Sequence, residues 1–388
     1  MKRCDIFFIV ISTLIYFFSP LLSFGFSIIA ISFINKDFSF KLILFICVLS
    51  IATISASRAY GVAENDDFVN YYNNYSALYD GHLKALFDFG GGLEFIFPLF
   101  SYFISLIPYK CTPNQFIFIV SFVGTGLYAL ALQRILSMNR FLFKNSGLFI
   151  AFSFLFYDYF ISTQLVRQFF SSIFIILLFT AKGKKELILF FIMSVLSHTT
   201  ALLIAPFTWL VINKRWGGWV VILSSVFISF FFYYGLEYVG SQFTFFADKA
   251  VYYSLDSTTT SSDILSGKLK LILFSLLLTL TTLWLDLIVK KNSDIILKKN
   301  AYYLFVYTVI YIILTPIPLA SDRFLLILNC FFIGSFIAIT VQRYNYIVAR
   351  AILTILVIWR IDIYSEPGNF LYWNGFESWG YFPGYFLL

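Results

Sequence analysis

Long apolar segments alternate with short polar segments along the whole chain, and this pattern predicts the class of fold. A helix that crosses the hydrocarbon core of a bilayer needs about 20 mainly apolar residues. The simple candidates for such helices are residues 42–57, 114–134, 145–160, 164–181, 217–237, 269–289, 301–318, 324–342 and 347–361. The pattern therefore predicts an all-α, polytopic integral membrane protein in which residues 1–388 form a single membrane domain.

Three further apolar segments do not fit one simple crossing. A continuous helix over residues 6–34 would be about 43 Å long, against a hydrocarbon core of about 30 Å, so we expect a tight helical hairpin there. Residues 187–213 are interrupted at Ser197–Thr200, which predicts either two crossings or a re-entrant loop tipped by His198. Residues 95–109 contain two prolines, and we expect a half-helix or an interfacial helix.

Charged residues assign sides to these segments. Two connections, 58–94 and 238–267, contain more acidic than basic residues, and we predict that both are periplasmic loops. Short turns rich in lysine and arginine are expected to be cytoplasmic. These basic residues are Lys182, Lys184, Lys185, Lys214, Arg215, Lys290, Lys291, Lys298, Lys299, Arg343 and Arg350.

The two assignments agree when residues 6–34 form a hairpin and residues 95–109 do not cross fully. A single long helix at 6–34 would instead place the 58–94 loop in the cytoplasm. Acidic residues contribute little to membrane orientation, so charge alone leaves this second topology open. We favour the hairpin.

Composition supports a membrane protein and excludes several functions. Hydrophobic residues make up 60% of the chain and charged residues 12%, against about 25% charged residues in ordinary globular proteins. The net charge of +7 is dispersed rather than clustered, so no nucleic acid partner is expected. The four cysteines lie far apart, which argues against a metal site, and no phosphate-binding loop for ATP is present.

Arg167 stands out because neither residues 145–157 nor residues 168–181 carry a charge. A guanidinium cannot lose its proton to escape an apolar setting, and an ionisable group within a membrane is by default a candidate functional residue. The alternative is that Arg167 reaches an interface and only fixes the topology.

Four polar stretches carry a resemblance to a known group of proteins: "SRAYGVAENDDFVNYYNNY", "GGLEFIFPLF", "STQLVRQFF" with "SHTTALL", and "PLASDRFLLIL". In this order they resemble the motifs of bacterial polysaccharide polymerases of the Wzy (O-antigen polymerase) and EpsG-like group. The chain departs from that pattern in having five residues between Gly61 and Asp67, and Phe95 where proline is usual. The matching positions are Arg58, Gly61, Asp67, Tyr71, Glu94, Arg167, Gln168, His198, Thr200 and Arg323.

The resemblance implies a fold and an activity. The fold would be a GT-C-like bundle of about 11–14 transmembrane or half-spanning helices in the bacterial inner membrane. The activity would be transfer of a growing glycan from undecaprenyl diphosphate to a lipid-linked acceptor repeat unit on the periplasmic face. Membrane lipid and a chain-length regulator would be partners, and no cofactor is expected.

The chemistry of this reaction suggests roles for the matching residues. A departing lipid diphosphate needs positive charge on its oxygens, and arginine binds phosphate by two points. The acceptor hydroxyl needs a base or an orienting acceptor, for which Asp66, Asp67, Glu94 and neutral His198 are the candidates. We predict that the catalytic residues are Arg167, Arg323, Asp67 and His198. The predicted substrate-binding residues are Arg58, Asp66, Tyr71, Tyr72, Glu94 and Gln168.

Each assignment has a structural alternative. Arg323 follows an aspartate in a turn and would also suit an ordinary surface, and His198 would also suit a packed, hydrogen-bonded position. The tyrosines after Asp67 would form either a platform for sugar rings or an aromatic belt at the interface. No metal site is expected, because the carboxylates lack ligand-like spacing and arginines can neutralise the diphosphate.

Three other functions compete with a polymerase. An O-antigen ligase uses the same donor, but ligases typically carry a large periplasmic loop late in the chain, and the loop at 238–267 is short. A glycosyltransferase that uses a lipid monophosphosugar would share the early acidic loop. A flippase is disfavoured because the chain shows no internal repeat.

Overall fold

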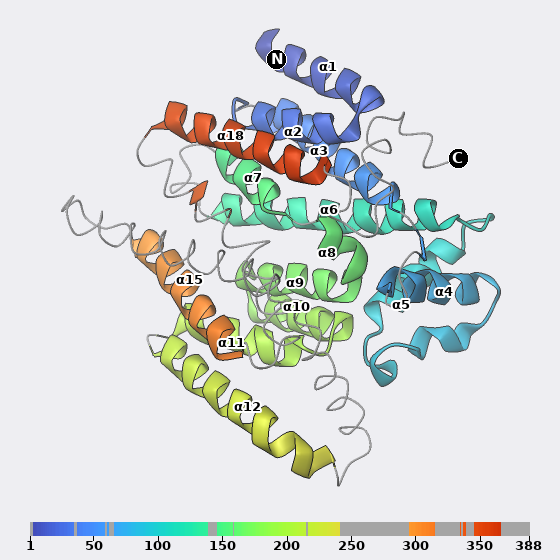
Figure 1. Ribbon diagram of the computed structural model, residues 1–388, viewed down its shortest axis with the longest axis vertical. Helices are drawn as coiled ribbons and strands as arrows, with labels where there is room; N and C mark the ends of the chain where they lie inside the picture. The colour runs from blue at the N-terminus through green and yellow to red at the C-terminus, as the bar shows by residue number, and fades with distance from the viewer. Residues whose placement is uncertain are drawn as a thin grey trace. The chain divides into compact units, whose positions relative to one another are not determined.

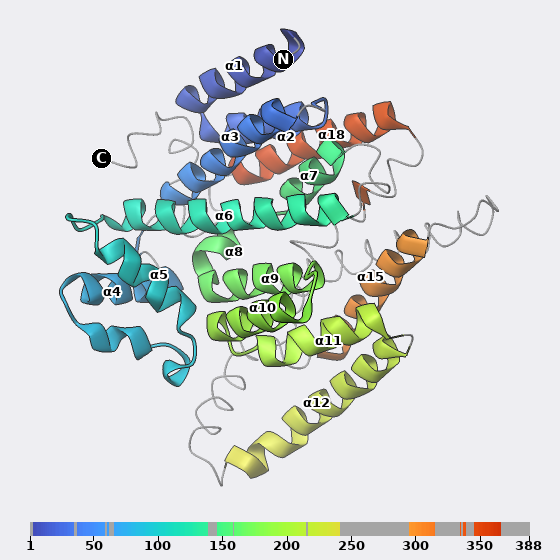
Figure 2. The ribbon, with the colours of Figure 1, turned by 180° about the vertical axis from the view of Figure 1, so that it is seen from behind.

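The computed structural model describes residues 3–34, 37–58, 60–61, 66–138, 146–157, 159–214, 216–240, 295–314, 334, 337–338 and 345–365. The elements in these ranges are helices, as the sequence pattern predicts (Figures 1 and 2). By its internal contacts the chain divides into two compact units. Unit 1 comprises Met1–Leu202 and Val341–Leu388, and unit 2 comprises Leu203–Thr340.

Unit 1 contains most of the helices. They are α1 (Arg3–Phe18), α2 (Pro20–Ile31), α3 (Asp37–Ala56), α4 (Asp67–Tyr79), α5 (Ile96–Ser105), α6 (Pro113–Met138), α7 (Ser146–Leu155), α8 (Tyr159–Gln164), α9 (Val166–Phe179), α10 (Lys184–Ser197) and α18 (Tyr346–Ser365). Two short 3-10 helices, η1 (Leu83–Phe87) and η2 (Gly90–Gly92), lie between α4 and α5.

The hairpin predicted for residues 6–34 is confirmed. The helix breaks at Ser19–Pro20, where proline occupies the first position of α2. The chain then folds back, as the contact between Phe8 and Phe33 shows: their rings stack with centroids 5.9 Å apart. The hydroxyl of Ser23 also donates to the carbonyl of Ser12 at 3.0 Å. A continuous helix would hold residues 8 and 33 about 37 Å apart.

Helices α3 and α6 form the centre of unit 1, and both are long and apolar enough to cross a membrane. Hydroxyl groups join helices within the core. Ser55 and Ser121 hydrogen-bond between α3 and α6 at 2.9 Å, and Tyr16 of α1 bonds to Thr53 of α3 at 2.7 Å. Such pairs are typical of membrane helices, where lipid offers polar groups no alternative partner.

Several apolar helices are shorter than a full crossing. Helix α5 has ten residues, about 15 Å, which confirms a short helix within residues 95–109. The candidate crossing at 145–160 is also shorter than expected, because α7 ends at Leu155 and the separate helix α8 follows. Residues 187–213 break as predicted: α10 ends at Ser197, and the backbone of His198 is extended.

The segment predicted as the 58–94 loop is folded rather than irregular. Its central part forms the helix α4, which packs against α5 (Figure 1). Tyr71 and Tyr75 point into the core, where Tyr75 stacks on Phe116 with ring centroids 4.7 Å apart. The hydroxyl of Tyr75 accepts the amide of Cys111 at 2.8 Å, which ties α4 to the start of α6.

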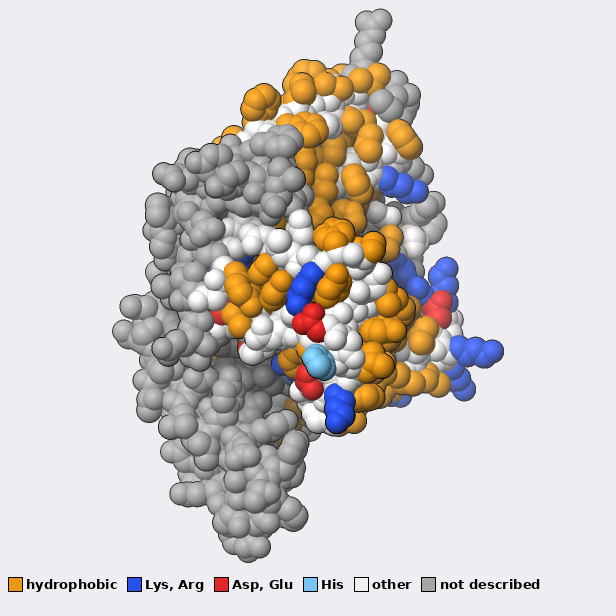
Figure 3. All heavy atoms as spheres, turned by 90° about the vertical axis from the view of Figure 1, so that its right-hand side faces the viewer, with side chains coloured by type: hydrophobic (Ala, Val, Ile, Leu, Met, Phe, Trp, Pro, Cys, Tyr) orange, Lys and Arg blue, Asp and Glu red, His pale blue; other side chains and the backbone are white. Residues whose placement is uncertain are grey.

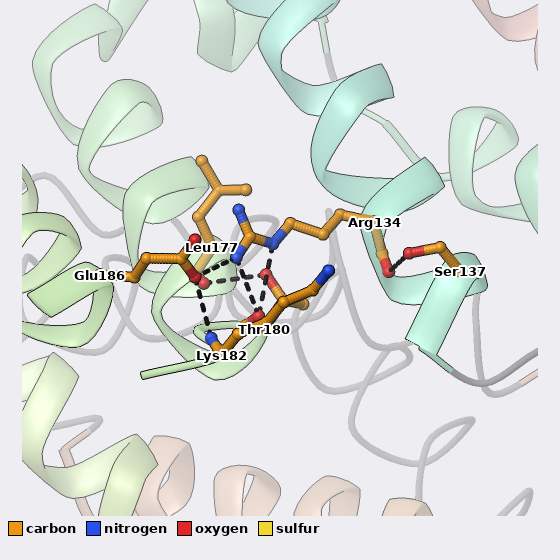
Figure 4. A network of polar contacts seen from close by, with 6 residues as sticks. All are labelled: Arg134, Ser137, Leu177, Thr180, Lys182 and Glu186. Atoms are coloured by element: carbon orange, nitrogen blue, oxygen red, sulfur yellow. Dashed lines mark hydrogen bonds and ion pairs between the residues drawn. The ribbon is translucent and has the colours of Figure 1, made fainter. Parts of the chain in front are cut away.

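A polar clasp joins α6 to the turn between α9 and α10 (Figure 4). Arg134 donates to the carbonyl of Thr180 at 3.1 Å and forms an ion pair with Glu186. The carboxylate of Glu186 in turn accepts the amide of Lys182 at 2.8 Å. The clasp satisfies a carbonyl at the carboxyl end of α9, the end opposite Arg167.

The helices given bounds in unit 2 are α11 (Ala201–Asn213), whose first two residues still belong to unit 1, α12 (Gly217–Gly240) and α15 (Ile295–Leu314). Helices α12 and α15 pack together, and a hydrogen bond between Thr208 and Tyr307 joins α11 to α15. Arg323, the segment 269–289, and most of 238–267 and 324–342 lie outside the described residues.

Candidate functional site

Arg167 lies in the first turn of α9, directly after the break at Leu165 that separates α8 from α9. The guanidinium is therefore at a helix end rather than in the middle of an apolar helix. It packs over the rings of Phe89, 4.6 Å from the centroid, and Tyr71, 5.9 Å from the centroid. Its charge is balanced by an ion pair with Glu94, whose side chain is only 3% exposed.

Glu94 is positioned by a turn of three glycines. Gly90, Gly91 and Gly92 have φ angles of 56°, 64° and 84°, which residues other than glycine rarely adopt. Gly90 has a further reason to be glycine, because a Cβ atom there would lie 2.6 Å from Cγ of Glu94. The turn thus places the Glu94 side chain against the backbone of Gly90, and the carboxylate reaches Arg167 of α9.

Three residues donate four hydrogen bonds to the Glu94 carboxylate. Oε2 accepts from Arg167. Oε1 is bonded to Nδ1 of His198 at 2.7 Å, to the backbone amide of Thr199 at 3.0 Å and to the Thr199 hydroxyl at 2.9 Å. We call Glu94, Arg167, His198 and Thr199 the Glu94 cluster. All four belong to unit 1.

The neighbours of Glu94 keep it ionised. Burial by itself would raise the pKa of Glu94, but the hydrogen bond and charge of His198, the charge of Arg167 and the Thr199 amide outweigh it. Together they lower the pKa of Glu94 to about 2. At neutral pH Glu94 is therefore an anchored anion and a weak base.

The ionised carboxylate decides the hydrogen-bonding role of His198. An ionised carboxylate only accepts hydrogen bonds, so Nδ1 of His198 must carry a proton. In the neutral ring Nε2 is then the nitrogen with a lone pair. A carboxylate that orients an imidazole in this way is a recurrent arrangement for a general base.

The break between α10 and α11 makes these contacts possible. The carbonyl of His198 accepts the amide of Ala201 at 3.0 Å, so His198 precedes the first turn of α11. Amide groups at the start of a helix lack partners within the helix. The Thr199 amide finds its partner in Glu94, which precedes it by 105 positions.

Helix α4 brings two further predicted residues to Arg167. Asp67 lies in the first turn of α4, and Tyr71 follows one turn later. Both interact electrostatically with Arg167, and Tyr71 also hydrogen-bonds with it. Burial raises the pKa of Tyr71, so its phenol stays neutral. The structure thus gathers Asp67, Tyr71, Glu94, Arg167 and His198.

A second buried cluster holds the start of α4, and we call it the Arg58 cluster. Arg58 forms an ion pair with Asp66 and donates to the side-chain oxygen of Gln164 at 2.9 Å. Asp66 is also the N-cap of α4 and accepts the amide of Phe68 at 3.0 Å. The side chains of Arg58 and Asp66 are fully buried. The cluster joins α3, α4 and α8.

The other predicted site residues have different surroundings. Gln168 is buried in α9, one position after Arg167. Tyr72 is partly buried and donates to the carbonyl of Cys111 at 2.9 Å. Tyr71 packs on Phe97 with ring centroids 4.8 Å apart and is 2% exposed, so it offers no open face to a sugar ring in this structure.

Sequence reasoning missed Thr199, Gln164 and the role of the glycine turn. The run Gly90–Gly92 was a visible signal for an unusual backbone. For Thr199 the sequence offered two adjacent threonines after His198 and no means of choosing between them.

Within the described ranges, no group of three histidine, cysteine or acidic side chains is placed to hold a metal ion. Metal independence remains a prediction.

Figure 3 shows the side of the molecule where α4 and α5 lie in Figure 1. Hydrophobic side chains cover much of the described surface in this view, with charged side chains between them. One exposed ion pair joins Asp80, the residue that caps the carboxyl end of α4, to Lys110 at 3.0 Å. The Glu94 cluster, by contrast, is largely buried.

Apolar helices around a buried, charged cluster define an all-α membrane protein with a candidate polar site at the ends of its helices. Residues 41–372 match the EpsG family, so the chain belongs to that family of polysaccharide-polymerase-like membrane proteins. No curated protein and no solved structure matched the chain. The match includes all residues of both clusters.

Proposed function

We propose that this protein is a polysaccharide polymerase of the inner membrane. It transfers a growing glycan from undecaprenyl diphosphate to a hydroxyl of a lipid-linked repeat unit, on the periplasmic side. The observation that supports this most directly is the Glu94 cluster. It joins a cation suited to a diphosphate to an imidazole suited to a hydroxyl, through one buried carboxylate.

In this proposal Arg167 binds the leaving diphosphate. Its side chain is 24% exposed, so Arg167 is partly accessible from outside the protein. One of its nitrogens bonds to Glu94, while its buried Nε–H has no hydrogen-bond partner among the described residues. A planar fork with remaining donors can bind two phosphate oxygens. Positive charge fixed in this position stabilises the developing oxyanion.

His198 is the proposed general base. Glu94 holds its Nδ1–H, and Nε2 takes the proton from the acceptor hydroxyl as the oxygen attacks the anomeric carbon of the donor sugar. The bond from that carbon to the diphosphate oxygen breaks, and the diphosphate leaves with the electron pair. Glu94 and Asp66 are less suited to accept the proton, because both are buried and paired with arginine. Asp67 remains the second candidate.

The test uses purified protein in lipid vesicles with undecaprenyl-diphosphate-linked repeat units from the source strain. A ladder of lipid-linked chains on a gel would support a polymerase, and we expect it to persist in EDTA. Transfer of glycan only to a lipid A-core acceptor would identify a ligase. Movement of the lipid across the bilayer without new glycosidic bonds would identify a flippase.

A further inference from the structure

Oxygen Oε1 of Glu94 accepts three hydrogen bonds, and Thr199 supplies two of them. The Thr199 amide and hydroxyl approach at 3.0 and 2.9 Å, and His198 approaches at 2.7 Å. An amide can only donate, and a hydroxyl facing an ionised carboxylate also donates. Thr199 therefore fixes where Oε1 lies, and Oε1 fixes where the His198 ring lies.

We infer that Thr199 is a positioning residue for the reaction: it holds the Glu94 carboxylate in the orientation that keeps His198 ready as a base. This inference rests on the proposed function and adds a residue to it. Thr199 has no direct part in bond making. Its effect passes through Glu94 to His198, and a carboxylate free to rotate would hold the imidazole less firmly.

Thr200 provides a matched control. It is the threonine that the family-like H-x-T pattern places two positions after His198. In the described structure, however, the bonds to Glu94 come from Arg167, His198 and Thr199, and Thr200 contributes none. The two threonines are adjacent and both precede α11, so replacing either one makes the same chemical change in nearly the same backbone.

The experiment compares Thr199→Val, Thr199→Ser and Thr200→Val in the vesicle polymerisation assay, with protein amount measured by blot. Valine keeps the shape and the amide but removes the hydroxyl. We expect Thr199→Val to lower kcat roughly tenfold with little change in KM, since one hydrogen bond to a charged group is lost. Thr199→Ser restores the hydroxyl and should recover most of kcat. Thr200→Val should resemble the wild type.

The pH profile separates positioning from a purely structural role. A carboxylate that has lost one donor attracts the imidazolium proton more strongly, so the acid limb of kcat should move to higher pH in Thr199→Val. Full activity of Thr199→Val, or equal losses in the two valine variants, would overturn the inference while leaving the polymerase proposal intact. A wild-type protein that makes no polymer would overturn both.

Discussion

At the scale of single residues, Arg167 has a permanent charge, and its surroundings compensate that charge in two ways. Glu94 supplies a counter-ion, and the rings of Phe89 and Tyr71 supply the negative faces that attract a cation. Neither interaction would require arginine in particular, because lysine is also a cation. The need for arginine comes from the proposed two-point contact with the diphosphate.

Replacing Arg167 by lysine tests that contact. Lysine keeps the charge but not the planar fork, so Arg167→Lys should lose about 10²–10³ in polymerisation rate, and Arg167→Ala should be inactive. Polymer length on a gel, compared at equal protein amounts determined by blot, measures the activity of both variants. A fully active Arg167→Lys would exclude the two-point contact. A fully active Arg167→Ala would remove Arg167 from the mechanism and leave Arg323 as the principal cation.

The lowered pKa of Glu94 predicts how stability depends on pH. A carboxyl whose pKa falls on folding stabilises the protein above its unfolded pKa, and this stabilisation is lost as pH falls through the folded pKa. For Glu94 the window runs from about 4.5 down to about 2, and the full effect is on the order of 3 kcal/mol. The difference in unfolding temperature between wild type and Glu94→Gln should therefore shrink between pH 6 and pH 3. A constant difference would contradict the strong pairing of Glu94.

At the scale of elements, the glycine turn offers a test of how Glu94 is positioned. Gly90 and Gly91 have similar positive φ angles, but only at Gly90 would a Cβ meet Glu94; at Gly91 it would meet nothing within 4 Å. Both alanine variants carry the backbone strain of a positive φ, about 1–2 kcal/mol. Gly90→Ala should in addition displace the carboxylate and reduce polymerisation well below that of Gly91→Ala. Equal activities at equal protein amounts would mean that the turn does not position Glu94.

The Arg58 cluster suggests that Arg58 anchors α4 rather than contacting substrate. Removing one partner of a buried ion pair typically costs about 3–5 kcal/mol, so Arg58→Met should lower the unfolding temperature sharply. In the double variant Arg58→Met/Asp66→Asn, asparagine removes the unpaired charge and can still cap α4. The double variant should regain much of the lost stability. If Arg58→Met is instead stable and inactive, the substrate-binding role predicted from sequence is the better explanation.

Elements that depend on length and local pattern could be predicted from the sequence. The hairpin at 6–34 follows from a segment too long for one crossing, and the break at Ser197–Thr200 follows from polar residues in an apolar run. Helix α4 was missed although its signal was present: Phe68, Tyr71, Tyr75 and Leu78 are buried at helical spacing. The acidic residues around them made the segment look like a loop.

The candidate site could be predicted in part. Arg167, Glu94, His198 and Asp67 were recognised through the resemblance, and the structure brings them together. The bonds between them could not be foreseen, because Glu94 and Thr199 are 105 positions apart and meet only after α5, α9 and α10 have packed. Packing likewise decides which of two adjacent threonines faces the carboxylate.

At the scale of the whole molecule, the described part of unit 1 places two kinds of surface at opposite ends of α6. The hydroxyl of Tyr72 and the carbonyl of Cys111 tie α4 to the start of α6. The Arg134 clasp ties the basic turn at Lys182 to its other end (Figure 4). From Pro113 to Arg134 the helix rises about 32 Å, close to the thickness of a hydrocarbon core. A crossing by α6 would separate α4 from the basic turn, and we predict that it does.

This separation leads to a prediction about sidedness. The positive-inside rule places the basic turn in the cytoplasm, so α4 and the adjacent Glu94 cluster should face the periplasm. In a variant with all four native cysteines replaced, a cysteine at Asn73, exposed on α4, should react with a membrane-impermeant maleimide in intact spheroplasts. A cysteine at Lys184, exposed at the start of α10, should react only after the membrane is opened.

Labelling of Lys184→Cys alone in intact cells would reverse the orientation and place the Glu94 cluster on the side opposite to the proposed polymerisation. Labelling of both would show that α6 does not separate them across a membrane.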